Sequence, residues 1–138
     1  MRKRHLLCCL LVVLAGCDGQ GATYVDVSIE DASVERHGSE VTFTGQFRVL
    51  DHRVGTFNLK NVRVVFENES GSTLKTIQLG NIPNTKVRHN ISANFTDPPH
   101  RVLIETGEVN VDARVVLHGV RWQETEGYEY FEYKILEG

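Results

Sequence analysis

The chain has 138 residues, with 15 basic and 18 acidic side chains and a formal net charge of −3. This length suits one domain with a single hydrophobic core, and the sequence lacks the basic stripe that a nucleic-acid-binding surface needs. All three cysteines lie within the first 17 residues. Disulfides, thiolate metal sites and cysteine nucleophiles are therefore excluded for the rest of the chain.

The N-terminal segment has the organisation of a secretion signal. Arg2, Lys3 and Arg4 form a positively charged start, and ten uncharged residues follow from Leu6 to Ala15. Such a run is far shorter than the ~20 apolar residues of a membrane-spanning helix. The segment is therefore predicted to be a targeting sequence and not part of the fold.

The end of this segment, Leu14-Ala15-Gly16-Cys17, resembles the lipobox at which bacterial and archaeal lipoprotein precursors are cut before the cysteine. The resemblance implies a diacylglyceryl group on the Cys17 thiol and a further acyl chain, such as palmitate, on the freed amine. It also implies attachment to the cell membrane, on its extracytoplasmic face, through the lipid on Cys17.

Cleavage at this point defines three parts of the chain. Residues 1–16 are expected to be the signal peptide, 17–23 a lipidated tether, and 24–138 a single domain. The 122 residues that remain carry 12 basic and 18 acidic side chains. An acidic domain of this size is expected to fold without a metal or disulfide.

Beyond the tether, apolar and polar residues alternate with a period of two, which is typical of strands with one buried face. Residues 24–29 form the first such run, and its parity slips by one at Ala32 and Val34, which predicts a β-bulge or a strand that switches sheets. The clearest runs are 41–49 and 87–95, with Phe43 and Phe47 on the buried face of the former.

Shorter or less regular runs complete the chain. Turn residues separate 62–66 from 74–79, the latter closed by Gly80 and Pro83. Further strands are predicted at 102–104, 113–123 and 128–136, the last two as a terminal hairpin. No stretch after the signal segment shows helical periodicity. About seven to eight strands in ~120 residues predict an all-β domain, an immunoglobulin- or fibronectin-like antiparallel β-sandwich.

The run from Phe57 to Phe66, followed by Gly71 to Gly80, is similar to sandwich domains of the late-embryogenesis-abundant type and to related extracytoplasmic adhesion-like modules. Both share a strand, a small-residue turn and a return strand that ends in Leu-Gly. The similarity covers roughly residues 57–104. It implies a β-sandwich and says little about activity.

Catalytic and metal-binding patterns are weak. His89 and His118 fall among residues of apolar parity, where imidazoles on facing strands could bind copper or zinc. No histidine pair has a local ligand spacing, and no serine lies in a Gly-x-Ser-x-Gly turn. We therefore expect structural histidines, no cofactor, no metal site and no enzyme activity, although a site assembled from scattered residues would leave no local motif.

Three Asn-x-Ser/Thr triplets begin at Asn68, Asn90 and Asn94. Parity places Asn90 and Asn94 on the solvent face of their strand, and Asn68 falls in a turn. Glycan acceptors must be accessible, so all three are candidate glycosylation sites.

Aromatic residues concentrate in the terminal hairpin. Phe131, Tyr133 and Ile135 share one parity and are predicted to face the core, whereas Tyr128 and Tyr130 share the other. With Trp122, these two tyrosines form a candidate partner surface, or they cap the sheet edge against neighbouring side chains, which is the outcome we favour.

These observations favour a lipid-anchored, extracytoplasmic β-domain that acts as a non-catalytic interaction or envelope-structural module, with an envelope protein as its expected partner. The alternatives are an accessory lipoprotein that presents a ligand or metal to a membrane complex, and a small hydrolase.

Overall fold

The computed structural model describes residues 24–52, 57–83, 87–107, 109–111 and 114–137. The signal segment, the lipobox and the tether lie outside these residues. The described strands are β1 (Tyr24–His37), β2 (Glu40–His52), β3 (Phe57–Glu67), β4 (Thr73–Pro83), β5 (Val87–Phe95), β6 (Arg101–Glu105), β7 (Val109–Val111), β8 (Arg114–Gln123) and β9 (Gly127–Glu137). The described chain is all-β, as predicted.

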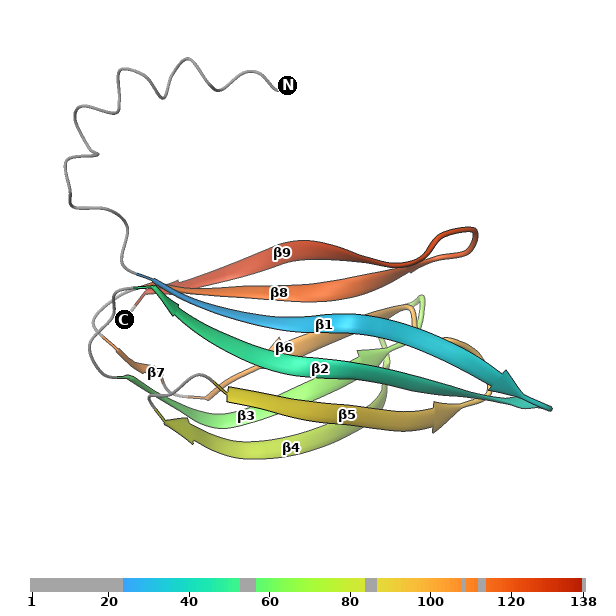
Figure 1. Cartoon of the computed structure of the whole chain (residues 1–138), viewed down its shortest axis with the longest axis horizontal. Coiled ribbons are helices and arrows are strands. Elements are labelled where there is room, and N and C mark those ends of the chain that lie inside the picture. The colour runs from blue at the N-terminus through green and yellow to red at the C-terminus, as the bar shows by residue number, and fades with distance from the viewer. Residues whose placement is uncertain (1–23, 53–56, 84–86, 108, 112–113, 138) are drawn as a thin grey trace, which may run out of the picture.

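The strands form one curled sheet in the order β4-β3-β6-β8-β1-β2-β5, with β7 paired to β3 and β9 paired to β8. The curl gives a half-barrel that folds around the core (Figure 1). The predicted pairing was antiparallel throughout, and this is wrong at one place, because β1 and β8 run parallel. The described fold is thus a mixed, curled sheet.

Strand β8 connects the two sides of the curl. Residues 114–118 pair with β1, whereas Val120 and Arg121 pair with β6. The buried face changes at this transition: odd-numbered residues, Val115 and Leu117, are buried in the first half, and even-numbered Val120 is buried in the second. Gly119 lies at the crossing, and a Cβ atom there would lie 2.5 Å from the Val102 carbonyl oxygen. Only glycine fits this close approach.

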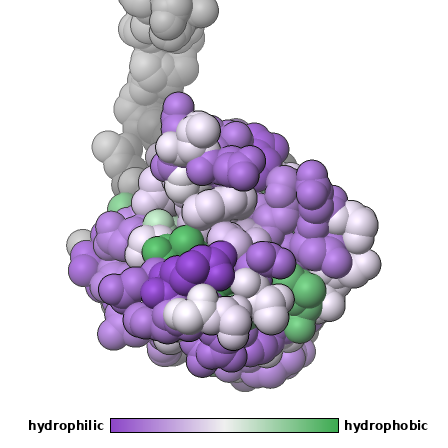
Figure 2. Space-filling model, turned by 90° about the vertical axis from the view of Figure 1, so that its right-hand side faces the viewer, coloured by the Kyte–Doolittle hydropathy of each residue, from purple (hydrophilic) through white to green (hydrophobic). Residues whose placement is uncertain are grey.

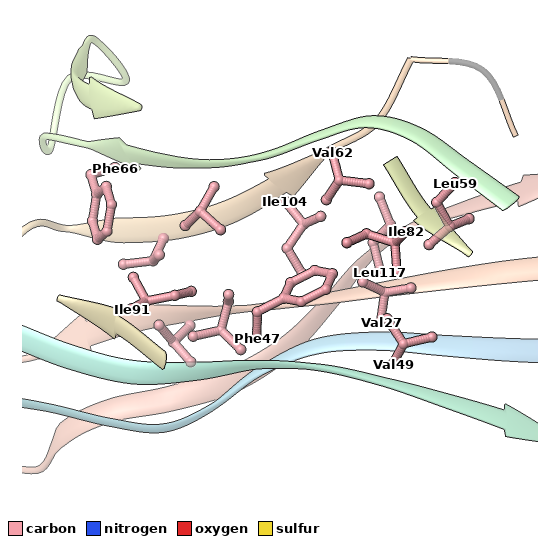
Figure 3. Packing of buried hydrophobic residues seen from close by; sticks show 14 of the residues in the cluster. Val27, Phe47, Val49, Leu59, Val62, Phe66, Ile82, Ile91, Ile104 and Leu117 are labelled. Atoms are coloured by element: carbon pink, nitrogen blue, oxygen red, sulfur yellow. The ribbon is translucent and has the colours of Figure 1, made fainter. Parts of the chain in front are cut away.

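The core lies inside the curl and is built from both sides of it. Figure 3 shows Val62 and Phe66 of β3 pointing toward Phe47 and Val49 of β2. Phe43, Phe47 and Phe66 are fully buried. The Phe43 and Phe66 rings pack edge to face, with their centroids 5.3 Å apart. Burial of each such side chain contributes about 1.5–3 kcal/mol, so the packing of the two sides holds the curl.

Several sequence predictions are confirmed. Val41, Phe43, Phe47 and Val49 are buried on one face of β2. The parity slip in the first strand is a β-bulge, since the β1–β2 register shifts between Glu30 and Ser33. The terminal hairpin forms as expected, with β8 and β9 joined through residues 124–126.

Other elements differ from the sequence prediction. Strand β4 does not end at Gly80, where φ is +79°, but continues through a register shift to Pro83. The three-residue β7 was not predicted, because a strand that short carries no readable alternation. His89 follows the buried parity of its strand but is exposed.

The predicted faces of the terminal strand are partly wrong. Tyr128 was expected at the solvent face, but its ring packs edge to face on Phe43, with the centroids 5.4 Å apart. Ile135 was expected in the core, but it is 44% exposed. Ile135 changes face because Tyr133 is the extra residue of a bulge between the Leu117 and His118 pairings. Tyr133 and exposed Tyr130 lie as predicted.

Tyr133 replaces a missing strand partner. Strand β8 pairs only with Arg101 and Val102 of β6. Farther along β6, the Tyr133 hydroxyl accepts a hydrogen bond from the Ile104 N–H and donates one to the Ile104 carbonyl, both at 2.5 Å. Burial raises the pKa of Tyr133 well above its ordinary value. The two bonds satisfy backbone groups that would otherwise be costly to bury.

The two described ends of the chain meet at one end of the molecule, since Tyr24 and Glu137 both lie beside Arg114 in the sheet register. The turn between β3 and β4 lies at the opposite end (Figure 1). Among the described residues, no helix has the length and apolarity required to cross a membrane.

Candidate functional site: a polar groove on the outer sheet face

Four adjacent strands, β2, β1, β8 and β9, present both polar and apolar side chains away from the core. Their inward neighbours, such as Val25, Val27 and Leu117, are buried, so alternation turns the intervening residues outward. The sheet register aligns these outward residues in rows that cross the strands. The first row holds Leu50, Asp26, Val116 and Ile135. The second row holds Arg48, Ser28, His118 and Glu132.

Two side-chain pairs lie on this face: the first links the two rows, and the second joins Arg48 of the second row to Glu30, the next outward residue of β1. Nε2 of His118 lies 2.9 Å from Oδ1 of Asp26, and Nη1 of Arg48 donates to Oε1 of Glu30 at 2.6 Å. The His118 and Asp26 side chains are 28% and 27% exposed. At this partial exposure each pair contributes modestly to stability, about 1 kcal/mol or less. Their main effect is to fix the orientation of four polar groups on one face.

Two adjoining hollows lie over these side chains. One, of about 410 Å³, is lined by Asp26, Ser28, Glu30, Arg48, Leu50, His118 and Tyr130. The other, of about 420 Å³, is lined by Tyr24, Asp26, Arg114, Val116, His118, Glu132 and Ile135. Asp26 and His118 line both hollows. We refer to the two together as the outer groove.

Tyr130 forms one wall of the outer groove. Its side chain is 56% exposed, and its hydroxyl accepts a hydrogen bond of 3.0 Å from the Asp31 N–H. Asp31 lies in the β1 bulge, with φ +54°. The bulge therefore turns an amide toward β9 and holds the tyrosine by its hydroxyl.

The contacts in the groove direct a potential nucleophile and base to different partners. The Ser28 hydroxyl donates to Oε2 of Glu30 at 3.0 Å, whereas the His118 ring bonds to Asp26. Nucleophilic catalysis requires the hydroxyl to bond to the base. Ser28 and His118 are therefore not bonded to each other as a nucleophile and its base.

The described histidines do not gather into a metal centre. Among the residues that the structure describes, no group of three or more His, Cys, Asp or Glu side chains is placed to hold a metal ion. His118, which the sequence placed among residues of apolar parity, lies on the outer face instead. The His89 ring packs beside the Phe47 ring, with the centroids 6.0 Å apart.

The candidate glycosylation sites occupy accessible positions. Asn90 and Asn94 are exposed on β5, with their side-chain oxygens bonded to Gln46 and Thr42. Asn68 opens the turn before β4, and its Oδ1 accepts bonds from the Ser70 and Ser72 amides. The end of the molecule that carries this turn is mainly hydrophilic with small apolar patches (Figure 2). Modification of the three asparagines stays a prediction, as does lipidation of Cys17, which lies outside the described residues.

The structure separates the three aromatic residues of the predicted partner surface. Trp122 and Tyr128 stack edge to face at 5.0 Å, and the Tyr128 hydroxyl donates to the Pro99 carbonyl at 2.6 Å. Burial raises the pKa of Tyr128 well above its ordinary value. Tyr128 therefore packs against the core, while Tyr130 lies in the outer groove.

Sequence reasoning missed the central residues of the groove. Asp26 and His118 are 92 positions apart, and their contact depends on the parallel pairing of β1 with β8. Period-two alternation could have placed Asp26, Ser28 and Glu30 together on an outward face. The partner strand could not be identified in this way.

No family model matches the chain, and no curated protein matches it by sequence. Among solved structures, the chain is similar to one described as "X-ray structure of Northeast Structural Genomics Consortium target SoR45". The TM-score is 0.40 and the sequence identity 14%, and the match covers 84% of each chain. The function is therefore inferred from the residues of this chain.

Proposed function

We propose that this protein is a lipid-anchored, extracytoplasmic interaction module that binds a component of the cell envelope through the outer groove, without catalysis. The observation that carries the proposal is the pairing of Asp26 with His118 beside Arg48 and Glu30, which holds four polar side chains partly open to solvent on one sheet face. Fixed polar groups in a groove are a feature of recognition sites.

The position of the groove supports this role. Strand β1 begins at Tyr24, which lines the groove, and the lipobox resemblance places the lipid on Cys17. The seven tether residues, 17–23, reach at most about 25 Å when fully extended. A groove that starts at this end of the domain would lie close to the membrane surface and to envelope material next to it.

The finer fold type also belongs to this proposal. We infer that the curled sheet is a variant of the immunoglobulin- or fibronectin-like sandwich, in which β8 joins the two layers. Support comes from the pairing of its two halves with β1 and β6 and from the core between them. An experimental structure with two sheets stacked ~10 Å apart would test this.

A retention experiment tests the interaction role. Cells produce the full-length chain, membranes are dissolved in detergent, and the fraction that stays with the insoluble envelope is measured. Ser28→Arg places a long cation in the centre of the groove, and Thr76→Arg places the same side chain on an exposed part of β4. The proposal predicts that only Ser28→Arg releases the protein. Equal retention of both variants would contradict it.

A further inference from the structure

We propose that the ligand of the outer groove is a neutral carbohydrate chain. This inference rests on the proposed function, because it assigns a ligand class to the same groove. Four properties of the groove carry it: its mixture of positive and negative charges, its fixed donors and acceptors, its exposed aromatic ring and its open, elongated shape.

The groove carries charges of both signs. Asp26, Glu30 and Glu132 supply carboxylates, and Arg48 and Arg114 supply cations. The closest oppositely charged groups are already paired, Arg48 with Glu30 at 2.6 Å. A strongly anionic or cationic ligand would meet like charges along the groove, which disfavours its binding. A neutral polar ligand meets no such penalty.

The hydrogen-bonding groups match the chemistry of sugars. A sugar hydroxyl both donates and accepts, so its site needs donors and acceptors side by side. The Asp26 and Glu30 carboxylates accept, Arg48 donates, and the His118 ring does either according to its tautomer. Their mutual contacts hold these planar groups in place, which lowers the entropy lost on binding.

Tyr130 supplies an exposed aromatic ring to the site, beside the apolar side chains of Leu50, Val116 and Ile135 that also line the groove. Its ring is more than half exposed, although its hydroxyl is held by the Asp31 amide. The ring is therefore anchored by its polar end while its apolar carbons stay open to solvent. A fixed, exposed aromatic ring beside polar groups suits the C–H face of a sugar ring, and tyrosine provides such contact at low entropic cost.

The shape favours a chain over a single small molecule. The two hollows adjoin at Asp26 and His118 and follow β1 from Tyr24 to Glu30, a rise of about 20 Å for an extended strand. This length accommodates several consecutive sugar rings. Small-molecule sites, in contrast, bury most of their ligand in an enclosed cavity.

The test uses the full-length lipidated chain in detergent micelles. Neutral hexasaccharides of glucose, mannose, galactose and N-acetylglucosamine are titrated into it, and binding is followed by NMR chemical shifts and calorimetry. A charged control probe, a polygalacturonate hexasaccharide, is titrated in parallel. We expect at least one neutral probe to bind in the millimolar to micromolar range, with shifts at Asp26, Ser28 and His118, and the charged probe to bind more weakly.

Matched variants locate the binding site. Tyr130→Ser removes the exposed ring and is expected to weaken binding about tenfold or more. Leu74→Ser removes another exposed apolar side chain, 46% exposed on β4, and is expected to leave binding unchanged. Glu30→Gln keeps the shape of the groove and removes one carboxylate charge. Its effect on saccharide binding therefore tests the groove even if Tyr130→Ser lowers stability. A melting curve for each variant separates binding from folding.

The outcomes distinguish this inference from the proposed function. Failure of every neutral saccharide to bind, or stronger binding of the charged probe, overturns the carbohydrate assignment. In that case the retention experiment decides between ligands. If Ser28→Arg still releases the protein from the envelope, and protease treatment of the envelope releases the wild-type protein as well, the ligand is a protein and the interaction role stands. If Ser28→Arg is retained like Thr76→Arg, the proposed function fails as well.

Discussion

His118 and Asp26 meet at 2.9 Å across β1 and β8, which form a parallel pair in the sheet. Each side chain follows a buried residue, Leu117 and Val25 respectively, so alternation turns both outward. The contact therefore joins two distant segments of the chain on the face away from the core. It also marks the place where the two hollows of the outer groove adjoin.

The core of β2 provides the first prediction. Phe43→Ala and Phe47→Ala should each lower the free energy of unfolding by about 3–5 kcal/mol, because each removes a fully buried ring and leaves a cavity. Thr44→Ala lies between them on the exposed face and should have little effect. Denaturant midpoints measure all three. Equal losses at Thr44 and Phe43 would show that the faces of β2 are wrongly assigned.

The strand crossing at Gly119 provides the second. Gly119→Ala should destabilise the protein by about 3 kcal/mol or more, because the new Cβ would lie 2.5 Å from the Val102 carbonyl oxygen and backbone must shift to relieve it. Gly38→Ala is the comparison. It has a positive φ of +66° but no atom within 4 Å of the added carbon, so only the conformational cost of about 1–2 kcal/mol applies. The melting temperature of Gly119→Ala should lie well below that of Gly38→Ala. The reverse order would contradict the switch of β8 between sides.

Tyr133 provides the third. Tyr133→Phe keeps the ring but removes the hydroxyl that bonds both backbone groups of Ile104. Leaving these groups unpaired should cost about 1–3 kcal/mol. Tyr130→Phe loses one bond to an exposed amide and should cost less. Chemical denaturation compares the two, and a neutral Tyr133→Phe would mean that water or another group satisfies Ile104.

Alkaline pH provides the fourth. Burial raises the pKa of Tyr128 and Tyr133 in the folded protein above their value in the unfolded chain, about 10. Below that pH both states are protonated and the full stability is present. Above it the unfolded state ionises first, so stability falls as pH rises toward the folded pKa. The contribution of these two tyrosines to the unfolding free energy should be constant up to about pH 10 and then decline. The double variant Tyr128→Phe/Tyr133→Phe should decline less steeply, and an identical slope would contradict the burial of both hydroxyls.

Lipid attachment provides the fifth. Cys17→Ser cannot form the thioether, so the protein should move from the membrane fraction to soluble or uncleaved forms. Partition of full-length wild type and variant between aqueous and detergent phases measures this. A Cys17→Ser protein that is processed and still needs detergent would contradict the lipoprotein assignment.

Much of the strand content could be predicted from the sequence, because a sheet with one buried face imposes period-two alternation on runs such as 41–49. The bulge in β1 was visible for the same reason, as a slip in parity at Ala32 and Val34. Local patterns carry this information since each residue faces either the core or solvent.

The curl and the groove could not be predicted in this way. Which strands become neighbours depends on long-range packing, so the parallel pairing that brings His118 to Asp26 leaves no local signal. The face of Ile135 in β9 was mispredicted because Tyr133 forms a bulge. The bulge shifts the parity of the residues that follow it.

The most direct test of the outer groove as the binding surface is an NMR titration of the full-length lipidated protein in micelles with solubilised envelope material from the source cells. We predict shifts at the His118 ring, the Tyr130 ring and the amides of Asp26 to Glu30, with the Trp122 indole unchanged. Shifts that gather instead around Trp122, Leu74 and His100, at another hollow of the molecule, would contradict this account.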